Sequence, residues 1–190
     1  MSEAALPSRS RSRLAGRAGL LWLNALGGLA VLASYGLLFT RADASAVLWG
    51  GVPESLRPLY TTNMLLAAAG YFPFTALLVL ASDPARVRFF GRFGQGALYW
   101  LYGLVLIPSA LWMPLTFAYV DAPSAAGWWL VRADLALAGL GSLGLLGCTL
   151  TVQPRPARWL QALAVLGCLF FCLQTAVLDA TLWPAWYPPR

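Results

Sequence analysis

The side chains able to do chemistry in this chain are few, and their types restrict the chemistry. All 13 basic residues are Arg, and among the 190 residues there is no His and no Lys. Without His there is no imidazole base, no Ser–His triad and no His-ligated zinc or haem. Without Lys there is no Schiff-base chemistry. Seven carboxylates, three cysteines, tyrosine and arginine remain, so the composition disfavours an enzyme without excluding one.

The spacing of the reactive residues points the same way. Cys148, Cys168 and Cys172 all lie in apolar runs without a Cys-x-x-Cys pair, which indicates neither a disulfide framework nor a redox couple. No Asp-Asp-x-x-Asp motif is present to hold magnesium and a diphosphate. We therefore predict no catalytic residue and no metal site. An enzyme acting on a lipid or isoprenoid, with Asp134 or Asp179 as acid or base, stays an alternative.

The elements that must position these residues are membrane helices. Hydrophobic residues make up 59% of the chain and charged residues 11%, whereas soluble domains carry about a quarter charged residues. A soluble domain of this length has too much surface for its volume to bury that apolar content. We expect an all-α fold, an integral membrane bundle of five transmembrane helices, each near the ~20 residues that cross the ~30 Å of hydrocarbon. The predicted spans are about 18–40, 58–81, 94–119, 126–151 and 157–180, after a basic tail at 1–17.

The arginines predict the orientation. The tail and the loops 82–93 and 152–158 contain four, three and two Arg, whereas the opposite flanks balance Arg against acids. The positive-inside rule then places the N-terminus inside and the C-terminus outside. The net charge of +6 indicates an anionic leaflet rather than nucleic acid. We interpret the Ser/Arg-rich tail as a cytoplasmic flank, with an organelle transit peptide as the alternative. The membrane is either a bacterial inner membrane or an organellar one.

Polar side chains inside the spans are the candidates for function, because an ionisable group at mid-bilayer costs at least ~2.5 kcal/mol. Four side chains from different predicted helices share one depth in the outer half: Asn63, Trp112, Asp134 and Gln174. Polar groups that converge among aromatic residues favour an intramembrane cavity for a hydrophobic planar ligand. The supporting residues of this predicted site are Tyr60, Pro114, Trp128, Arg132 and Asp179. The alternative is a hydrogen-bond network between helices without a ligand.

Two further interpretations stay open at this stage. Arg132 either contributes to the cavity or extends to the outer headgroups. Asp179 ends a stripe with Thr175, Cys172, Cys168 and Gln161, spaced as one helical face. Such a stripe fits packing between helices better than it fits a metal or haem site.

Residues 109–117 read SALWMPLTF, and this segment resembles the TspO family of tryptophan-rich membrane proteins, the translocator or peripheral benzodiazepine-receptor group. That family's third helix carries a similar Leu-Trp-x-Pro followed by Phe. The resemblance implies a five-helix bundle, often dimeric, that binds porphyrins or other hydrophobic ligands beneath the first loop. Only Trp112 and Pro114 carry over. The second helix lacks the family's Trp-rich run, and Ser109 stands where the family has Asn.

The sequence thus predicts a polytopic binding protein, a sensor or carrier for a porphyrin- or sterol-like ligand, with enzyme activity disfavoured. A porphyrin or haem-type group is the one cofactor indicated. An accessory subunit of a larger membrane complex is the main alternative, because glycines face several sides of the fourth helix. Those glycines are Gly139, Gly141, Gly144 and Gly147. The expected partners are the bilayer, a small hydrophobic ligand, and a second copy or a membrane complex.

Overall fold

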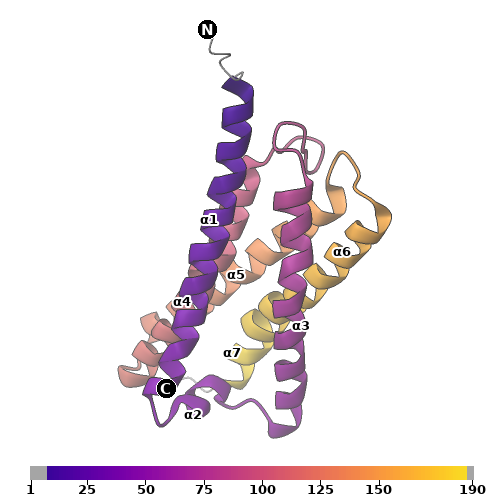
Figure 1. Cartoon of the computed structure of the whole chain (residues 1–190). Coiled ribbons are helices and arrows are strands. Elements are labelled where there is room, and N and C mark those ends of the chain that lie inside the picture. Colours follow the sequence, from indigo (N-terminus) through magenta and orange to yellow (C-terminus); the bar gives the residue numbers. More distant parts are fainter. Residues whose placement is uncertain (1–7, 188–190) are drawn as a thin grey trace.

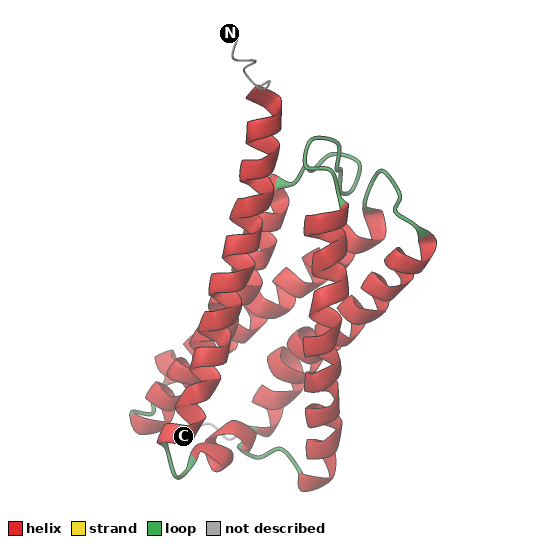
Figure 2. Cartoon of the chain, viewed as in Figure 1, coloured by secondary structure: helices red, strands yellow, loops and turns green. Residues whose placement is uncertain are grey.

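The computed structural model describes residues 8–187, and its long elements are helices. Five of them are long and apolar enough to cross a membrane: Gly16–Gly36, Glu54–Ala81, Gly96–Asp121, Ala125–Thr151 and Arg158–Trp186. The predicted all-α fold with five membrane helices is confirmed (Figures 1 and 2). The chain is therefore an integral membrane protein.

The spans are built from the following elements, in chain order. The first span lies within α1 (Ser8–Gly36) and is followed by a connection of η1 (Leu37–Thr40) and α2 (Ala44–Trp49). The second begins with η2 (Glu54–Leu56) and runs through α3 (Arg57–Thr75) into the π-helix η3 (Ala76–Ala81). The third and fourth are α4 (Gly96–Asp121) and α5 (Ala125–Thr151). The fifth is α6 (Arg158–Cys172), the π-helix η4 (Leu173–Leu182) and α7 (Trp183–Trp186).

The largest differences from the predicted bounds lie at the first and the last helix end. The first helix begins at Ser8, inside the predicted tail. Between Ser8 and Ala15 there is no Gly or Pro, so elongation of a formed helix adds a hydrogen bond for each residue fixed. The last span reaches Trp186 rather than 180. Pro184 lies in the first turn of α7, a helix position where proline is tolerated.

The helices form a closed ring in the order α1, α4, α5, α6 and α3, with η3 reaching back to α1. The start of α1 and the loops 82–95 and 152–157 lie together at one end, which we call the Arg88 end (Figure 1). The connection with α2 and the end of the last span lie at the other, the Arg41 end. The two arginine-bearing loops thus lie at the same end of the bundle, as expected when successive spans run in alternating directions. Which side of a membrane each end faces stays a prediction.

The crossing of α3 and α6 depends on two glycines. A Cβ atom added to Gly70 would lie 2.5 Å from the carbonyl oxygen of Gly167, and one added to Gly167 would lie 2.5 Å from that of Gly70. Asn63, Ala67 and Phe74 lie on the same buried face of α3 as Gly70. Without side chains at the crossing point, the two backbones approach closely, as small residues allow in membrane bundles.

The glycines of α5 pack against the chain's own helices. A Cβ on Gly139 would lie 3.0 Å from the Cα of Ala176 in η4, and one on Gly141 would lie 3.0 Å from the Cβ of Leu104 in α4. Gly144 and Gly147 face side chains of the same chain in the same way. These glycines suggested a surface for docking to a larger complex, but in the structure other parts of the same chain pack against them.

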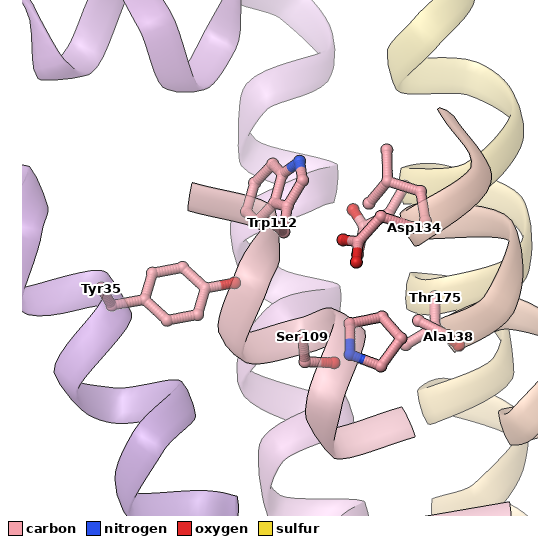
Figure 3. A pocket seen from close by; sticks show the side chains of 9 residues that line it. Tyr35, Ser109, Trp112, Asp134, Ala138 and Thr175 are labelled. Carbon is pink, nitrogen blue, oxygen red and sulfur yellow. The ribbon is translucent and has the colours of Figure 1, made fainter. Parts of the chain in front are cut away.

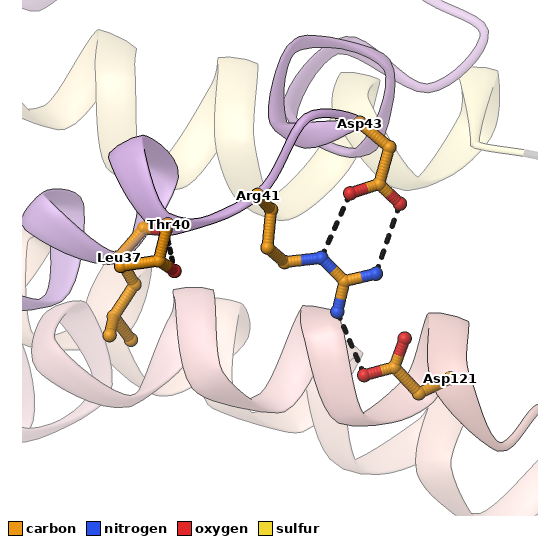
Figure 4. Close-up of polar contacts among 5 residues, drawn as sticks. All are labelled: Leu37, Thr40, Arg41, Asp43 and Asp121. Carbon is orange, nitrogen blue, oxygen red and sulfur yellow. Dashed lines mark hydrogen bonds and ion pairs between the residues drawn. The ribbon is translucent and has the colours of Figure 1, made fainter.

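Arg41 fastens the first connection to α4 (Figure 4). Its Nε and Nη2 donate to the two carboxylate oxygens of Asp43 at 2.9 and 3.0 Å, and its Nη1 donates to Asp121 at 2.8 Å. The guanidinium lies 4.8 Å from the ring centroid of Phe117. The hydrogen bonds that Arg41 donates to both carboxylates raise its pKa above the usual range, so this side chain stays charged at any pH used for purification.

We expect the Arg41→Gln variant to loosen residues 37–56, because Asp121 then loses its ionic link to the connection. Limited chymotrypsin digestion should cleave this segment faster in the variant. In the wild type, added salt should have a similar but smaller effect, since it screens exposed ion pairs. Arg132→Gln is the matched control: it removes the same charge from an exposed side chain that lies over Trp129. Equal cleavage rates in all three proteins would show that the ion pairs do not hold the connection.

Candidate functional site

Two adjoining cavities lie inside the bundle near the Arg41 end. The first, about 30 Å³, is called here the polar cavity and is lined by Tyr35, Pro108, Ser109, Trp112, Asp134, Leu135, Ala138, Thr175 and Asp179. The second, about 20 Å³, is called the aromatic cavity and is lined by Tyr35, Leu48, Trp49, Tyr60, Met64, Trp112, Gln174, Asp179 and Trp183. Tyr35, Trp112 and Asp179 belong to both. Since about 10–15 Å³ holds one water molecule, the polar cavity has room for about two or three and the aromatic cavity for about one or two.

Four of the five spans supply side chains to the polar cavity (Figure 3). Tyr35 reaches it from α1, Ser109 and Trp112 from α4, Asp134 from α5, and Thr175 from η4. Ser109 and Trp112 are three residues apart, which places them on one face of α4. The polar cavity is thus formed where four spans meet, and α3 lines only the aromatic cavity, through Tyr60 and Met64.

Two buried polar atoms of the polar cavity lack a hydrogen-bond partner. The Asp134 side chain is 6% exposed and its Oδ2 has none, and Trp112 is 7% exposed with an unpartnered Nε1. The Asp134 carboxylate points from α5 toward the Trp112 indole (Figure 3). A buried donor or acceptor without a partner costs about 1–3 kcal/mol. Because one is an acceptor and the other a donor, a group that both donates and accepts, such as a hydroxyl, would satisfy both.

A chain of hydrogen bonds holds Asp179 at the boundary of the two cavities. The Nδ2 of Asn63 donates to the Oε1 of Gln174 at 3.0 Å and to the carbonyl of Phe170 at 3.1 Å. The Nε2 of Gln174 then donates to the Oδ1 of Asp179 at 2.8 Å. Nearby, the hydroxyl of Tyr60 donates to the carbonyl of Leu178 at 3.2 Å. The last span is in this way tied to α3.

The contact between Gln174 and Asp179 exists because η4 is a π-helix. Residues five apart lie about 140° apart around an α-helix, and their side chains cannot meet. In a π-helix the hydrogen bonds run between residues five apart, so such residues lie one above the other. Thr181 shows the same winding, since its hydroxyl donates to the carbonyl of Ala176 at 2.8 Å. π-Helical turns inside longer helices are frequent at functional sites.

An aromatic cluster surrounds the cavities on the side of the Arg41 end. Trp112 makes edge-on contacts with Tyr35 and Trp183, at centroid distances of 6.1 and 5.7 Å. Trp183 lies 4.4 Å from the ring of Tyr187. The indole Nε1 of Trp183 donates to the carbonyl of Leu48 at 2.8 Å, which holds α2 over the aromatic cavity. The first connection is therefore a cover for the site.

The four residues predicted to bind the ligand lie near one another in the structure. Trp112 and Asp134 line the polar cavity, and Trp112 and Gln174 line the aromatic one. Asn63 is not among the residues that line the two cavities. It donates a hydrogen bond to Gln174, which lines the aromatic cavity. Their role in binding stays a prediction.

The five supporting residues separate into two groups. Asp179 lines both cavities, and Tyr60 lines the aromatic one. Trp128 stacks on Tyr187 at 5.7 Å, outside both linings. Pro114 and Arg132 are exposed, and the guanidinium of Arg132 lies 5.0 Å from the ring of Trp129. For Arg132 the structure thus agrees with an outward-facing side chain.

Sequence reasoning missed Tyr35 and Trp183 as members of the site. Tyr35 lies one residue before the end of α1, a helix whose large side chains are mostly exposed. The sequence signal that could have found Tyr35 is its position near the end of α1, next to the first connection. Trp183 lies beyond the predicted end of the last span. The sequence signal that could have found it is Pro184, the next residue. Proline is tolerated in the first turn of a helix, so Pro184 did not have to mean that the last span had already ended.

The stripe that ends at Asp179 is mainly a packing face. Cys168 and Cys172 are buried free thiols, and the hydroxyl of Thr175 donates to Ser142 of α5 at 2.7 Å. Within residues 8–187, no three His, Cys, Asp or Glu side chains are grouped closely enough to hold a metal ion.

Comparisons of the chain with protein-family models, with curated proteins and with solved structures found no match.

Proposed function

We propose that this membrane protein is a non-enzymatic binding protein, a sensor or carrier, for a hydrophobic ligand with a planar porphyrin- or sterol-like ring system. The ligand would occupy the joined polar and aromatic cavities. One observation carries the proposal: Asp134 Oδ2 and Trp112 Nε1, an unpartnered acceptor and donor, are buried at one cavity. A ligand group that pairs with both atoms would remove the free-energy cost of leaving them unpaired.

The surroundings of these atoms favour a ring system. The aromatic cavity is lined by Trp49, Tyr60, Trp112 and Trp183, and ligand sites are mostly apolar with a few placed polar groups. At about 30 and 20 Å³ the cavities are too small for a ring system, so a ring ligand enters only when the aromatic side chains part. The first connection, which covers the site, could move away to admit a ligand. It is held by contacts that can break and re-form, the Trp183–Leu48 hydrogen bond and the Arg41 ion pairs.

A binding titration in lipid nanodiscs tests the proposal, with protoporphyrin IX and the fluorescent sterol dehydroergosterol as probes. We expect Trp112→Leu to weaken binding of the accepted probe by about tenfold or more, the size expected for a central aromatic contact. Trp129→Leu is the matched control, since Trp129 is 63% exposed and lines neither cavity. Failure of both probes to bind the wild type, or equal affinities in both variants, would contradict the proposal.

A further inference from the structure

The acidic and basic residues that line the polar cavity are all of one kind, carboxylic acids. Asp134 and Asp179 both line it, and none of its lining residues is basic. Arg41 is held by Asp43 and Asp121, and Arg132 is exposed on α5 over an indole ring. Two carboxylates thus share a cavity among apolar helices without a basic side chain lining it. A buried carboxylate in such surroundings requires a positive partner or a proton.

The two cavities divide polar from apolar lining. Asp134, Ser109 and Thr175 line only the polar cavity. Trp49 and Trp183 line only the aromatic one, together with Tyr60 and Met64. Since the two cavities share Tyr35, Trp112 and Asp179, a single molecule can extend through both. A site with this division fits an amphiphile, with its polar group toward Asp134 and its apolar body toward α2.

The aromatic faces favour a positive polar group. Trp112 and Tyr35 line the polar cavity beside the two carboxylates, and indole and phenol rings attract cations over their faces. An ammonium group also supplies the N–H donors that Asp134 Oδ2 lacks. The unpartnered Nε1 of Trp112 requires an acceptor close to the ammonium, such as a hydroxyl oxygen or a retained water molecule.

We propose that the ligand of this site is an amphiphilic amine, whose ammonium group lies between Asp134 and Asp179 and whose apolar rings occupy the aromatic cavity. This inference rests on the proposed function and specifies the charge of the ligand. An anionic ring compound, such as a porphyrin with its carboxylates, would be repelled by the same two acids. The charge of the ligand thus decides among ring compounds of similar shape.

Three steroids with one ring system and different charges test the inference: 3β-aminocholestane, the neutral cholestanol, and cholestanol sulfate. Equilibrium binding to wild-type protein in neutral-lipid nanodiscs should give the order amine, neutral sterol, sulfate. We expect the amine to bind about tenfold tighter than the neutral sterol, a modest preference for one charge-assisted contact. In Asp134→Asn and in Asp179→Asn this preference should fall toward one. Asp83→Asn, at the Arg88 end, should keep it.

The possible results separate this inference from the proposed function. Equal binding of the amine and the neutral sterol to the wild type overturns the charged ligand and leaves the proposed function standing. An amine preference that persists in both cavity variants shows that the charge is recognised elsewhere, and also overturns it. If none of the three steroids binds, both proposals fail for sterol-like ligands. The Asn variants are isosteric and remove buried charge, so we expect them to fold.

Discussion

Replacing Gly70 by Ala is expected to destabilise the bundle, whereas the same replacement at Gly103 should leave it unchanged or stabilise it. At Gly70 the new methyl group would lie 2.5 Å from the carbonyl oxygen of Gly167, and backbone atoms of α6 cannot move aside as a flexible side chain would. Such overpacking costs about 1–3 kcal/mol of unfolding free energy. At Gly103 nothing lies within 4 Å of the added Cβ, so the helix propensity of Ala, worth up to ~1 kcal/mol, is the main effect.

Reversible unfolding of both variants in mixed detergent micelles measures this difference. Gly167→Ala serves as a second test of the same contact, because the clash is reciprocal. We expect it to behave like Gly70→Ala. If Gly70→Ala were as stable as Gly103→Ala, the close approach of α3 and α6 would be wrong, and the position of Asn63 opposite Gln174 would be in doubt with it.

Replacing Asn63 by Leu is the second change with a large expected effect. Asn63 is 3% exposed, and its amide donates both to Gln174 and to the carbonyl of Phe170. Leu would leave two buried acceptors without this donor, which lowers the free energy of unfolding by about 1–3 kcal/mol. Thr181→Val is the control. Its hydroxyl is exposed and bonded within its own helix, so the change should stay within about 0.5 kcal/mol.

A double-mutant cycle with Gln174→Leu separates the hydrogen bond from the volume change. When both partners are apolar, no acceptor of that pair is left unpaired. We therefore expect the double variant to lose about 1 kcal/mol less than the sum of the single variants. Strict additivity would indicate that Asn63 and Gln174 do not interact, and that the network holding Asp179 is not formed in the membrane.

The five spans were predictable because they depend on summed properties of about twenty residues each. Apolar length alone sets whether a helix can cross hydrocarbon, and single residues change it little. The buried face of α3, with Asn63, Gly70 and Phe74, is also of a kind that helical periodicity predicts, because these residues are seven and four positions apart. The glycine contacts of α5 did not. Glycines show that something approaches closely, but only the ring order of the helices shows that α4 and η4 of the same chain do so.

The site was predictable in part. A buried carboxylate and a deep indole are informative on their own, and Asp134 and Trp112 do line one cavity. The pairing of Gln174 with Asp179 could not be read from α-helical spacing, because it depends on the π-helical winding of η4. Tyr35 was missed because its helix is long and mostly exposed, so only the position of the cover reveals what lies beneath it.

The winding of η4 also bears on how such a chain tolerates changes of length. Losing one codon within Leu173–Leu182 would allow the segment to return to ordinary α-helical winding. If the lost residue lay between Gln174 and Asp179, these two would then be four residues apart, a spacing at which side chains also meet on an α-helix. The pairing of this amide and this carboxylate would thus survive the deletion, and the span would keep its apolar character. The segment therefore gives the chain room to lose a residue without losing either membrane insertion or this contact.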